Sequence, residues 1–536
     1  MLPCVALIMQ PGGPQTPHSY QAPVVTTQVP TMMAIPQGMT LVMPEPVPLS
    51  PAPTNLQMAR PSRPWRMYGR VVGLVVLLFF FEQSVAGGWI IALDGDPLWG
   101  ALCMVFAIPF MLAIVAMRRP RVVLLERAVP DSNGQLLHVI TSQHGSLQTQ
   151  IPTRLDRHLL RDDSILDVPA SSTSWLIFAI TVVVAIGLSI MLALDIAFWL
   201  AAILIIPTVL IGFSIPVMGW WSHSTKRIGL PTRRRDAEAW LMAGILSALP
   251  AVMINSWLFP GIITAILPNI SEDNLLYLGA MMSAPIGEEL CKAAAIWFFA
   301  SKIRSPKHGF QIGFTVGLGF AIIENLMYIS ESSAGVFFSV TILIRGIGSI
   351  PGHAFWTGLT GAAMGWTIMR ARATALQLAA EAGHQIKAPE KQGSDWKLVD
   401  KDSGVVLETP QSTVGGVAVN PAGIQIWTPT QEIITKKPWI TVPLPEKIVF
   451  GILLAMLGHA TWNGTSILLY LIAVDVGMSD IVYVLLELLL TVVLVTAVLV
   501  IGSGLLHSVR AAPDGSEVDE YQATLATMTQ QNNQKM

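Results

Sequence analysis

The stretch APIGEELCKAAAIWFF, residues 284–299, sets three ionisable side chains, Glu288, Glu289 and Lys292, in an apolar run. A charged side chain inside a membrane-spanning helix is costly, so such residues pair with one another and mark candidate functional sites. Lys292 follows Glu289 by three residues and Glu288 by four, and side chains at these spacings meet on one helix face. The stretch predicts a membrane helix with a polar face. Taken alone, the spacing fits a structural ion pair equally well.

The composition is that of a membrane protein. Of 536 residues, 52% are hydrophobic and only 12% are charged, and the mean hydropathy is +0.57. Soluble globular chains carry about 25% charged residues. The formal net charge of −2 offers no basic excess for nucleic acid. The three cysteines, Cys4, Cys103 and Cys291, are isolated, so neither a disulfide framework nor a cysteine metal site is expected.

Ten apolar segments are each close to the length of about 20 residues that a helix needs to cross a bilayer. They are 71–93, 97–117, 175–194, 197–220, 239–259, 275–300, 311–330, 337–369, 448–474 and 481–505. The eighth is too long for one straight helix, and GSIPGH at 348–353 is expected to kink it. The fold class predicted is an all-α polytopic membrane protein.

The charges between these segments predict the orientation. With ten spans, every basic cluster falls on one side of the membrane, and the other side receives mainly acidic residues. The basic clusters are Arg60 to Arg70, Arg118 to Arg121, Lys226 to Arg235, Lys302 to Lys307, Arg370 with Arg372, Lys436 with Lys437, and Arg510. Because basic loops stay in the cytoplasm, both termini and the loops 118–174 and 370–447 are expected there.

The domain organisation follows from these boundaries. It comprises a proline-rich, disordered cytoplasmic tail at 1–64, N-terminal spans at 65–259, a second transmembrane core at 260–370 and 448–505, a cytoplasmic insertion at 371–447 and a polar cytoplasmic tail at 506–536. The insertion contains the strand-like pieces GVVLE and GIQIW, so a small β module and a loose insertion both stay open.

Further polar residues lie within spans seven to nine. They are Glu324 and Asn325 in span seven, Arg345 and His353 in span eight, and His459 and Asn463 in span nine. At a rise of about 1.5 Å per residue, Glu288 and Glu324 each lie about 20 Å inside their antiparallel spans. The polar groups of four helices are therefore expected in one layer near the bilayer centre. Two small-residue grooves, Gly313-x-x-x-Gly317 and Gly361-x-x-x-Gly365, would let these helices pack closely.

Carboxylate, imidazole and carboxamide side chains together can hydrolyse an amide. A carboxylate takes a proton from water, and imidazole and amide groups stabilise the oxyanion. The chain lacks H-E-x-x-H, a rhomboid-like G-x-S-G and a helical G-x-G-D, so a protease here would be of the glutamate type. A proton-coupled transporter and a non-catalytic membrane scaffold are the alternatives. A transporter would repeat its polar pattern in both halves of the chain, whereas spans one to five lack the pattern of spans six to nine.

The sequence favours an enzyme without a cofactor, with zinc as the alternative. His353, His459 and a glutamate could form a two-His, one-carboxylate zinc site. Against this, His459 has Asn463 at i+4, where a zinc helix would carry a second histidine. Lys292 also supplies a positive charge that a metal would otherwise bring.

These residues resemble the motifs of the PrsW family of intramembrane proteases, and the chain is more distantly similar to the CAAX-prenyl-protease and abortive-infection superfamily. The resemblance covers 275–370 and 448–470. Its motifs are E-E-x-x-K at Glu288, Glu289 and Lys292, G-F-A-x-x-E-N at Gly319 to Asn325, the histidine His353, and H-x-x-x-N at His459 and Asn463.

The resemblance implies a protease of the bacterial plasma membrane that cuts membrane-anchored proteins, such as an anti-sigma factor. The catalytic residues predicted are Glu288, Glu289, Lys292, Glu324, Asn325, His353, His459 and Asn463. In this prediction Glu288 activates the water with Glu324 as the second carboxylate, and His459 and Asn463 stabilise the oxyanion. Glu289 and Lys292 orient the first carboxylate, and His353 is a donor or proton shuttle.

Overall fold

The structure is a computed structural model of the chain. It describes residues 49–51, 63–119, 122–131, 133, 137–142, 145–149, 152–161, 166–194, 196, 198–230, 232–333, 335, 337–384, 386, 396–399, 406–407, 413–414, 417–419, 425–426 and 440–535. The predicted disordered tail at 1–64 lies outside the described residues except for 49–51, 63 and 64, and most of the insertion at 371–447 lies outside them as well.

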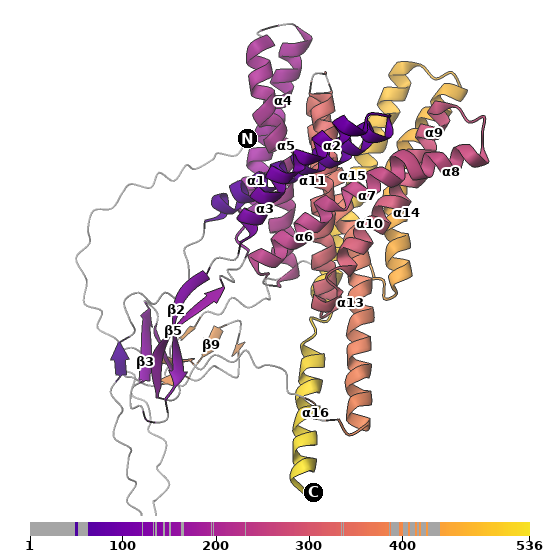
Figure 1. Cartoon of the computed structure of the whole chain (residues 1–536). Coiled ribbons are helices and arrows are strands. Elements are labelled where there is room, and N and C mark those ends of the chain that lie inside the picture. The colour runs from indigo at the N-terminus through magenta and orange to yellow at the C-terminus, as the bar shows by residue number, and fades with distance from the viewer. Residues whose placement is uncertain are drawn as a thin grey trace, which may run out of the picture. The chain divides into compact units, whose positions relative to one another are not determined.

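The described part of the chain is mainly helical (Figure 1). The helices are α1 (Pro64–Leu93), α2 (Pro97–Val105), α3 (Ala107–Arg118), α4 (Ser171–Ala193), α5 (Phe198–Ile228), α6 (Arg234–Leu246), α7 (Ala248–Met253), α8 (Phe259–Ile266), α9 (Glu272–Leu278), α10 (Ala284–Trp297), α11 (Pro306–Ser332), α12 (Phe338–Ile344), α13 (Ile350–Glu381), α14 (Ile448–Asp475), α15 (Asp480–Ala511) and α16 (Ser516–Lys535). Short π-helical segments, η1 (Ile254–Leu258), η2 (Gly279–Ser283) and η4 (Arg345–Ser349), interrupt three of the helical runs, and η3 (Ala300–Lys302) is a 3₁₀ turn.

Within the described residues, eight helices are long and apolar enough to cross a membrane. They correspond to eight of the ten predicted spans and confirm the polytopic all-α membrane fold. The other two predicted spans, 275–300 and 337–369, are also helical, as α9–η2–α10 and α12–η4–α13. These two carry Glu288, Glu289, Lys292, Arg345 and His353, and their polar residues lower the hydropathy that defines a span.

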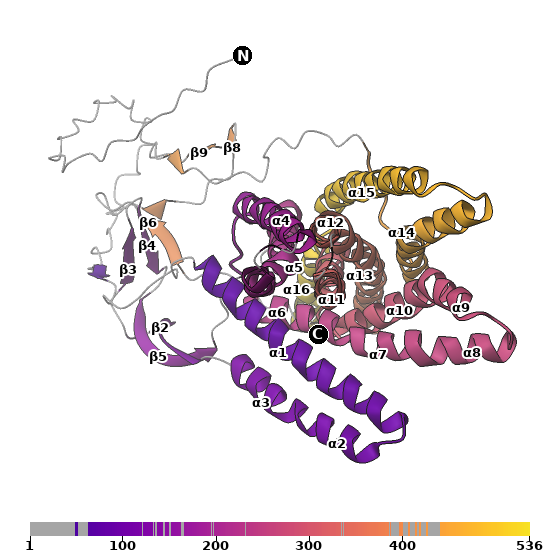
Figure 2. The ribbon, with the colours of Figure 1, turned by 90° about the horizontal axis from the view of Figure 1, so that it is seen from above.

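Helix α11 lies in the middle of the helical part, packed against α13, α6, α5 and α10 (Figure 2). Its glycines allow this close approach. A Cβ on Gly313 would meet the carbonyl oxygen of Thr357, and one on Gly317 would meet that of His353. The groove in α13 is equally tight, because a Cβ on Gly361 would meet the carbonyl oxygen of Gly309. Both predicted small-residue grooves are thus helix–helix contacts, and they press α11 against α13.

The described strands form three small sheets. In the first, β3 (Leu137–Ser142) pairs with β1 (Leu49–Pro51) in parallel and with β4 (Gly145–Thr149) antiparallel, and the sheet continues through β6 (Trp396–Val399) to β7 (Val406–Leu407). In the second, β2 (Val122–Pro130) pairs antiparallel with β5 (Thr153–Arg161). In the third, β9 (Val417–Val419) lies between β8 (Thr413–Val414) and β10 (Gln425–Ile426).

The two long loops meet in one sheet, which the sequence did not predict. Leu147 of β4 pairs with Leu398 of β6, across 251 residues of sequence, in an antiparallel ladder. Strands β7 and β10 lie within the strand-like pieces of the insertion, whereas the strands of the loop 118–174 had no predicted counterpart. Because paired strands must lie in one compartment, both loops are on the same side of the membrane.

Candidate functional site

Polar side chains of α10, α11, α13 and α14 form one buried cluster. Glu289, Lys292, His353 and His459 are each at most 2% exposed, and Glu288 is 9% exposed. The four helices bring together residues that are up to 171 positions apart in the sequence. The four helices therefore bring their polar side chains together, as the sequence predicted.

Lys292 lies at the centre of the cluster. Its Nζ donates to Oε1 of Glu289 at 2.7 Å and lies 2.9 Å from Nδ1 of His353. Oε2 of Glu288 is farther from it, at 3.6 Å. The ammonium also lies over the ring of Phe320, 3.8 Å from the ring centroid, which is a cation–π contact. Lys292 thus neutralises Glu289 first and links α10 to α13.

The Lys292 contact defines the protonation of His353. An ammonium has three donors and no acceptor, so Nδ1 of His353 must accept, and the ring proton is then on Nε2. Nε2 lies 2.5 Å from Oε2 of Glu324 as a close contact, but that oxygen accepts no aligned hydrogen bond. His353 therefore presents an N–H group beside Glu324.

His459 has the opposite polarity. Its Nδ1 lies 3.1 Å from Oε1 of Glu289, so a proton on Nδ1 is donated to that carboxylate. Nε2 then carries a lone pair and lies 3.8 Å from Oε2 of Glu288. Oε2 of Glu288 is buried and has no hydrogen-bond partner. The hydroxyl of Thr357 donates to the second oxygen of Glu289 at 3.4 Å.

Glu324 is held from both sides. Nη1 of Arg345 donates to its Oε1 at 2.9 Å, and His353 faces its Oε2. The Arg345 guanidinium lies 3.6 Å from the ring centroid of Tyr328 and also reaches Oγ of Ser349 at 3.3 Å. Arg345 therefore fixes the carboxylate that faces His353.

Each of the three π-helical segments supplies a residue to this arrangement. Asn255 of η1 donates to Oε1 of Glu288 at 3.3 Å, and Ser283 of η2 donates to Oδ1 of Asn255 at 2.8 Å. Arg345 begins η4. A π-helical turn shifts the phase of the side chains that follow, and such turns recur at functional sites. Here they turn Asn255 and Arg345 toward the two carboxylates of the site.

Two of the predicted residues make other contacts. Asn325 is fully buried, and its Nδ2 donates to the carbonyl oxygen of Ala321 within α11. Asn463 is one turn beyond His459, and its Nδ2 donates to the carbonyl oxygen of Ala280 in η2 at 3.2 Å. To stabilise an oxyanion, Asn463 would have to break its hydrogen bond to Ala280 and donate to the substrate oxygen instead.

The sequence reasoning missed Arg345, Asn255, Ser283 and Thr357 as members of the site. Arg345 had a usable signal, because an intramembrane arginine needs a partner and Glu324 is an intramembrane carboxylate of the preceding span. Asn255, Ser283 and Thr357 are ordinary residues of apolar helices, and no spacing rule marks them.

Glu288, His353 and His459 are also a possible metal site. One ligand atom from each lies within 4.8 Å of the others, and all three residues are buried. Three carboxylates, Glu288, Glu289 and Glu324, share the cluster with two cations, Lys292 and Arg345, so the fixed charges sum to about −1 when the histidines are neutral.

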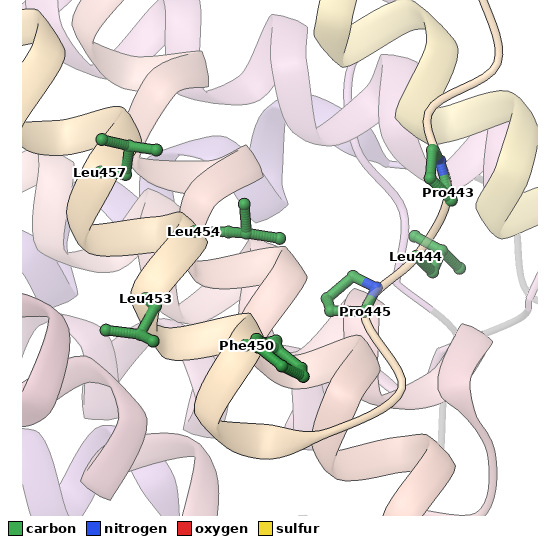
Figure 3. A pocket seen from close by; sticks show the side chains of 7 residues that line it. All are labelled: Pro443, Leu444, Pro445, Phe450, Leu453, Leu454 and Leu457. Carbon is green, nitrogen blue, oxygen red and sulfur yellow. The ribbon is translucent and has the colours of Figure 1, made fainter.

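Two cavities lie near these helices. One, of about 360 Å³, is apolar and lies between α14 and the segment 443–445 (Figure 3). Its lining includes Phe450 and Leu454 but none of the ionisable residues of the cluster. The other, of about 540 Å³, has Arg345 in its lining and so adjoins the cluster.

Residues 237–384 match the sequence model of a family described as PrsW family intramembrane metalloprotease. The match contains the motifs at Glu288, Glu324 and His353, whereas His459 and Asn463 lie outside it. No curated protein and no solved structure matches the chain. The matched segment supplies α10, α11 and α13 to the polar cluster, and α14 completes it. The chain therefore carries a PrsW-family intramembrane protease domain and is a membrane-embedded peptidase.

Proposed function

We propose that the chain is a glutamate-type endopeptidase that hydrolyses peptide bonds of membrane-anchored proteins at the Glu288–Glu324–His353–His459 cluster. The observation that carries the proposal is the pair of carboxylate oxygens, Oε2 of Glu288 and Oε2 of Glu324, each facing an imidazole Nε2 inside a buried site. A carboxylate in that position can take a proton from water, and an imidazole N–H can stabilise an oxyanion.

Glu288 is the general base in this mechanism. Its Oε2 is buried without a hydrogen-bond partner, so it is free to accept a proton from the attacking water, while Asn255 holds Oε1. As the C–O bond forms, the carbonyl oxygen gains charge, and the Nε2–H of His353, which makes no aligned hydrogen bond to the nearby Oε2 of Glu324, is the donor that stabilises it. His353 therefore takes the donor role that was predicted for His459.

His459 is the proton carrier to the leaving amine. Glu289 accepts from its Nδ1 and stabilises the imidazolium, as an aspartate does for the histidine of a serine protease triad. Its Nε2 faces Glu288, so the proton taken from water passes through the imidazole to the amine nitrogen as the C–N bond breaks. Lys292 neutralises Glu289 and keeps His353 in its Nε2–H form.

The description of the family raises the question of a metal. By distance and donor type, Glu288, His353 and His459 would hold a zinc ion, which would polarise the carbonyl and lower the pKa of a bound water. The Lys292 contact opposes this fit, because it places the proton of His353 on the nitrogen that would have to bind the ion. A metal ion next to Lys292 would also be repelled by the positive charge of the ammonium. The residues as arranged therefore do not fit a metal ion, and the enzyme proposed is metal-independent.

The substrate class proposed is a membrane-anchored protein, because the site lies inside the helical core of a membrane protein. An anti-sigma-factor-like substrate is the candidate that the family resemblance implies. On the family resemblance we place the enzyme in a bacterial plasma membrane. The charge distribution between its spans puts both termini in the cytoplasm in this proposal.

Reconstitution into lipid vesicles with a tagged, single-span substrate tests the proposal. The wild-type chain should release a fragment, with mass spectrometry defining the bond cut. Glu288→Gln should lower the rate by about 10²–10⁴-fold, the range that general acid–base groups contribute. Glu272→Gln, an exposed glutamate at the start of α9, is the matched control and should cut at the wild-type rate. Equal rates in the Glu288→Gln variant and the wild type would contradict the proposal.

A further inference from the structure

The buried cluster is most exposed on one side. The side chains of Glu289 and Lys292 are 1% and 0% exposed, whereas those of Glu324 and Arg345 are 20% and 17% exposed. A hydrolase needs water at its carboxylates, and a site inside a bilayer receives it only through a path of its own. The exposure points to the Glu324–Arg345 side as that path.

A cavity of about 540 Å³ lies on that side, between the end of α11 and α12. Its polar lining consists of Tyr328, Glu331, Ser332, Thr341 and Arg345. A water molecule occupies about 30 Å³ and needs two to four polar partners. The cavity has both the room and the partners for a short chain of water molecules.

The cavity leads from the end of α11 to the site. Ser332 is the last residue of α11, and Glu324 precedes it by eight positions, which is about 12 Å of helix. Arg345 lines the cavity and donates to Oε1 of Glu324, so one guanidinium touches both the cavity and the catalytic carboxylate. The cation–π contact with Tyr328 and the bond to Ser349 hold that guanidinium in place.

We propose that the cavity between α11 and α12 is the water entry of the peptidase, and that Arg345 forms its inner end and positions Glu324. The inference rests on the proposed function, since water is the co-substrate of hydrolysis. The ligand is water, and the competing occupant of such a cavity is a lipid acyl chain. Water and lipid are distinguished by a reagent that is soluble only in water.

Thiol labelling in open membrane fragments tests whether water or lipid fills the cavity, and it does not depend on peptidase activity. Thr341→Cys places a thiol in the cavity lining, and Leu343→Cys places one on the same helix at a side chain that is 40% exposed but outside the lining. Both are made in a chain whose Cys4, Cys103 and Cys291 are changed to alanine. A charged thiosulfonate should modify Thr341→Cys and leave Leu343→Cys unmodified, because an apolar side chain exposed on the outside of a spanning helix is expected to meet lipid and not water.

A cavity filled with lipid would leave Thr341→Cys unreactive to the charged reagent and reactive to an uncharged one. That result, or equal modification of the two variants by the charged reagent, overturns the inference.

The second measurement links the cavity to catalysis. Modified Thr341→Cys should cut at least about tenfold more slowly with KM unchanged, because water delivery limits the chemical step and not substrate binding. Reduction of the mixed disulfide should restore the rate, which rules out unfolding. A modified variant that cuts at the unmodified rate overturns the water-entry role. Charged labelling of the cavity in a chain that cuts no substrate would contradict the proposed function alone.

Discussion

Nζ of Lys292 lies 2.9 Å from Nδ1 of His353, so an ammonium on one helix sets the tautomer of an imidazole on another. The same ammonium is 2.7 Å from Glu289, which in turn accepts from His459. One buried cation therefore gives the two histidines opposite polarity, one presenting an N–H and the other a lone pair. This difference is what allows the two imidazoles to serve as donor and as proton carrier in one site.

Lys292→Met should abolish cleavage and destabilise the protein. Methionine has nearly the volume of lysine but leaves Glu289 without its closest cation, and removing one partner of a buried ion pair costs about 3–5 kcal/mol. Lys302→Met is the matched control, because Lys302 pairs with Asp236 at 3.0 Å while 52% exposed. Thermal unfolding in detergent should show a clear loss for the first variant and almost none for the second. Equal midpoints would contradict the central role of Lys292.

Arg345→Met should lower the cleavage rate strongly, because Oε1 of Glu324 loses its donor and the carboxylate can turn away from His353. Arg345→Lys restores the charge but not the geometry of the guanidinium, so partial recovery is expected. Arg370→Met, which removes an exposed pair with Glu446, is the control. Rates measured on the same reconstituted substrate check this. Full activity in Arg345→Met would contradict the role of Arg345 in positioning Glu324.

A strong chelator should leave the activity of the purified enzyme unchanged, because Lys292 fixes His353 as an N–H donor. Metal analysis of the active protein should find far less than one zinc per chain. Loss of activity with the chelator, reversed by stoichiometric zinc, would instead assign Glu288, His353 and His459 as ligands. In that case His459→Ala should lose the bound zinc together with the activity.

Gly317→Ala should disturb the site from the helix–helix contact beneath it. The added Cβ would meet the carbonyl oxygen of His353, so α11 and α13 must separate, at about 1–3 kcal/mol for an overpacked core position. Gly187→Ala in α4 has open space around its Cβ and is the control, with a gain of about 0.5–1 kcal/mol in helix stability. Unfolding midpoints and cleavage rates should both fall for Gly317→Ala alone.

Reporter fusions should place both termini and the loop 370–447 in the cytoplasm, because the basic clusters between the spans gather on that side. The β4–β6 pairing adds that the loop 118–174 shares their compartment. A reporter within the loop 370–447 that is active only outside the cell would break the ten-span arrangement.

The sequence by itself determined which residues are polar within the membrane and which of them share a helix. Glu289 and Lys292 are three residues apart, so helical geometry alone brings them together whatever surrounds them. The small-residue grooves of α11 and α13 were likewise visible as a four-residue spacing, and the structure confirms both as contacts.

Only the tertiary structure decided which partners those residues meet across helices. The rotation of a helix about its axis is set by packing, and here three π-helical turns alter it in ways that no periodicity signals. Lys292 thereby meets His353 and Arg345 meets Glu324, while Asn463 donates to the Ala280 carbonyl. The pairing of β4 with β6 also joins two loops whose sequences carry no mark of each other, because strand partners are chosen by the fold that brings their edges together.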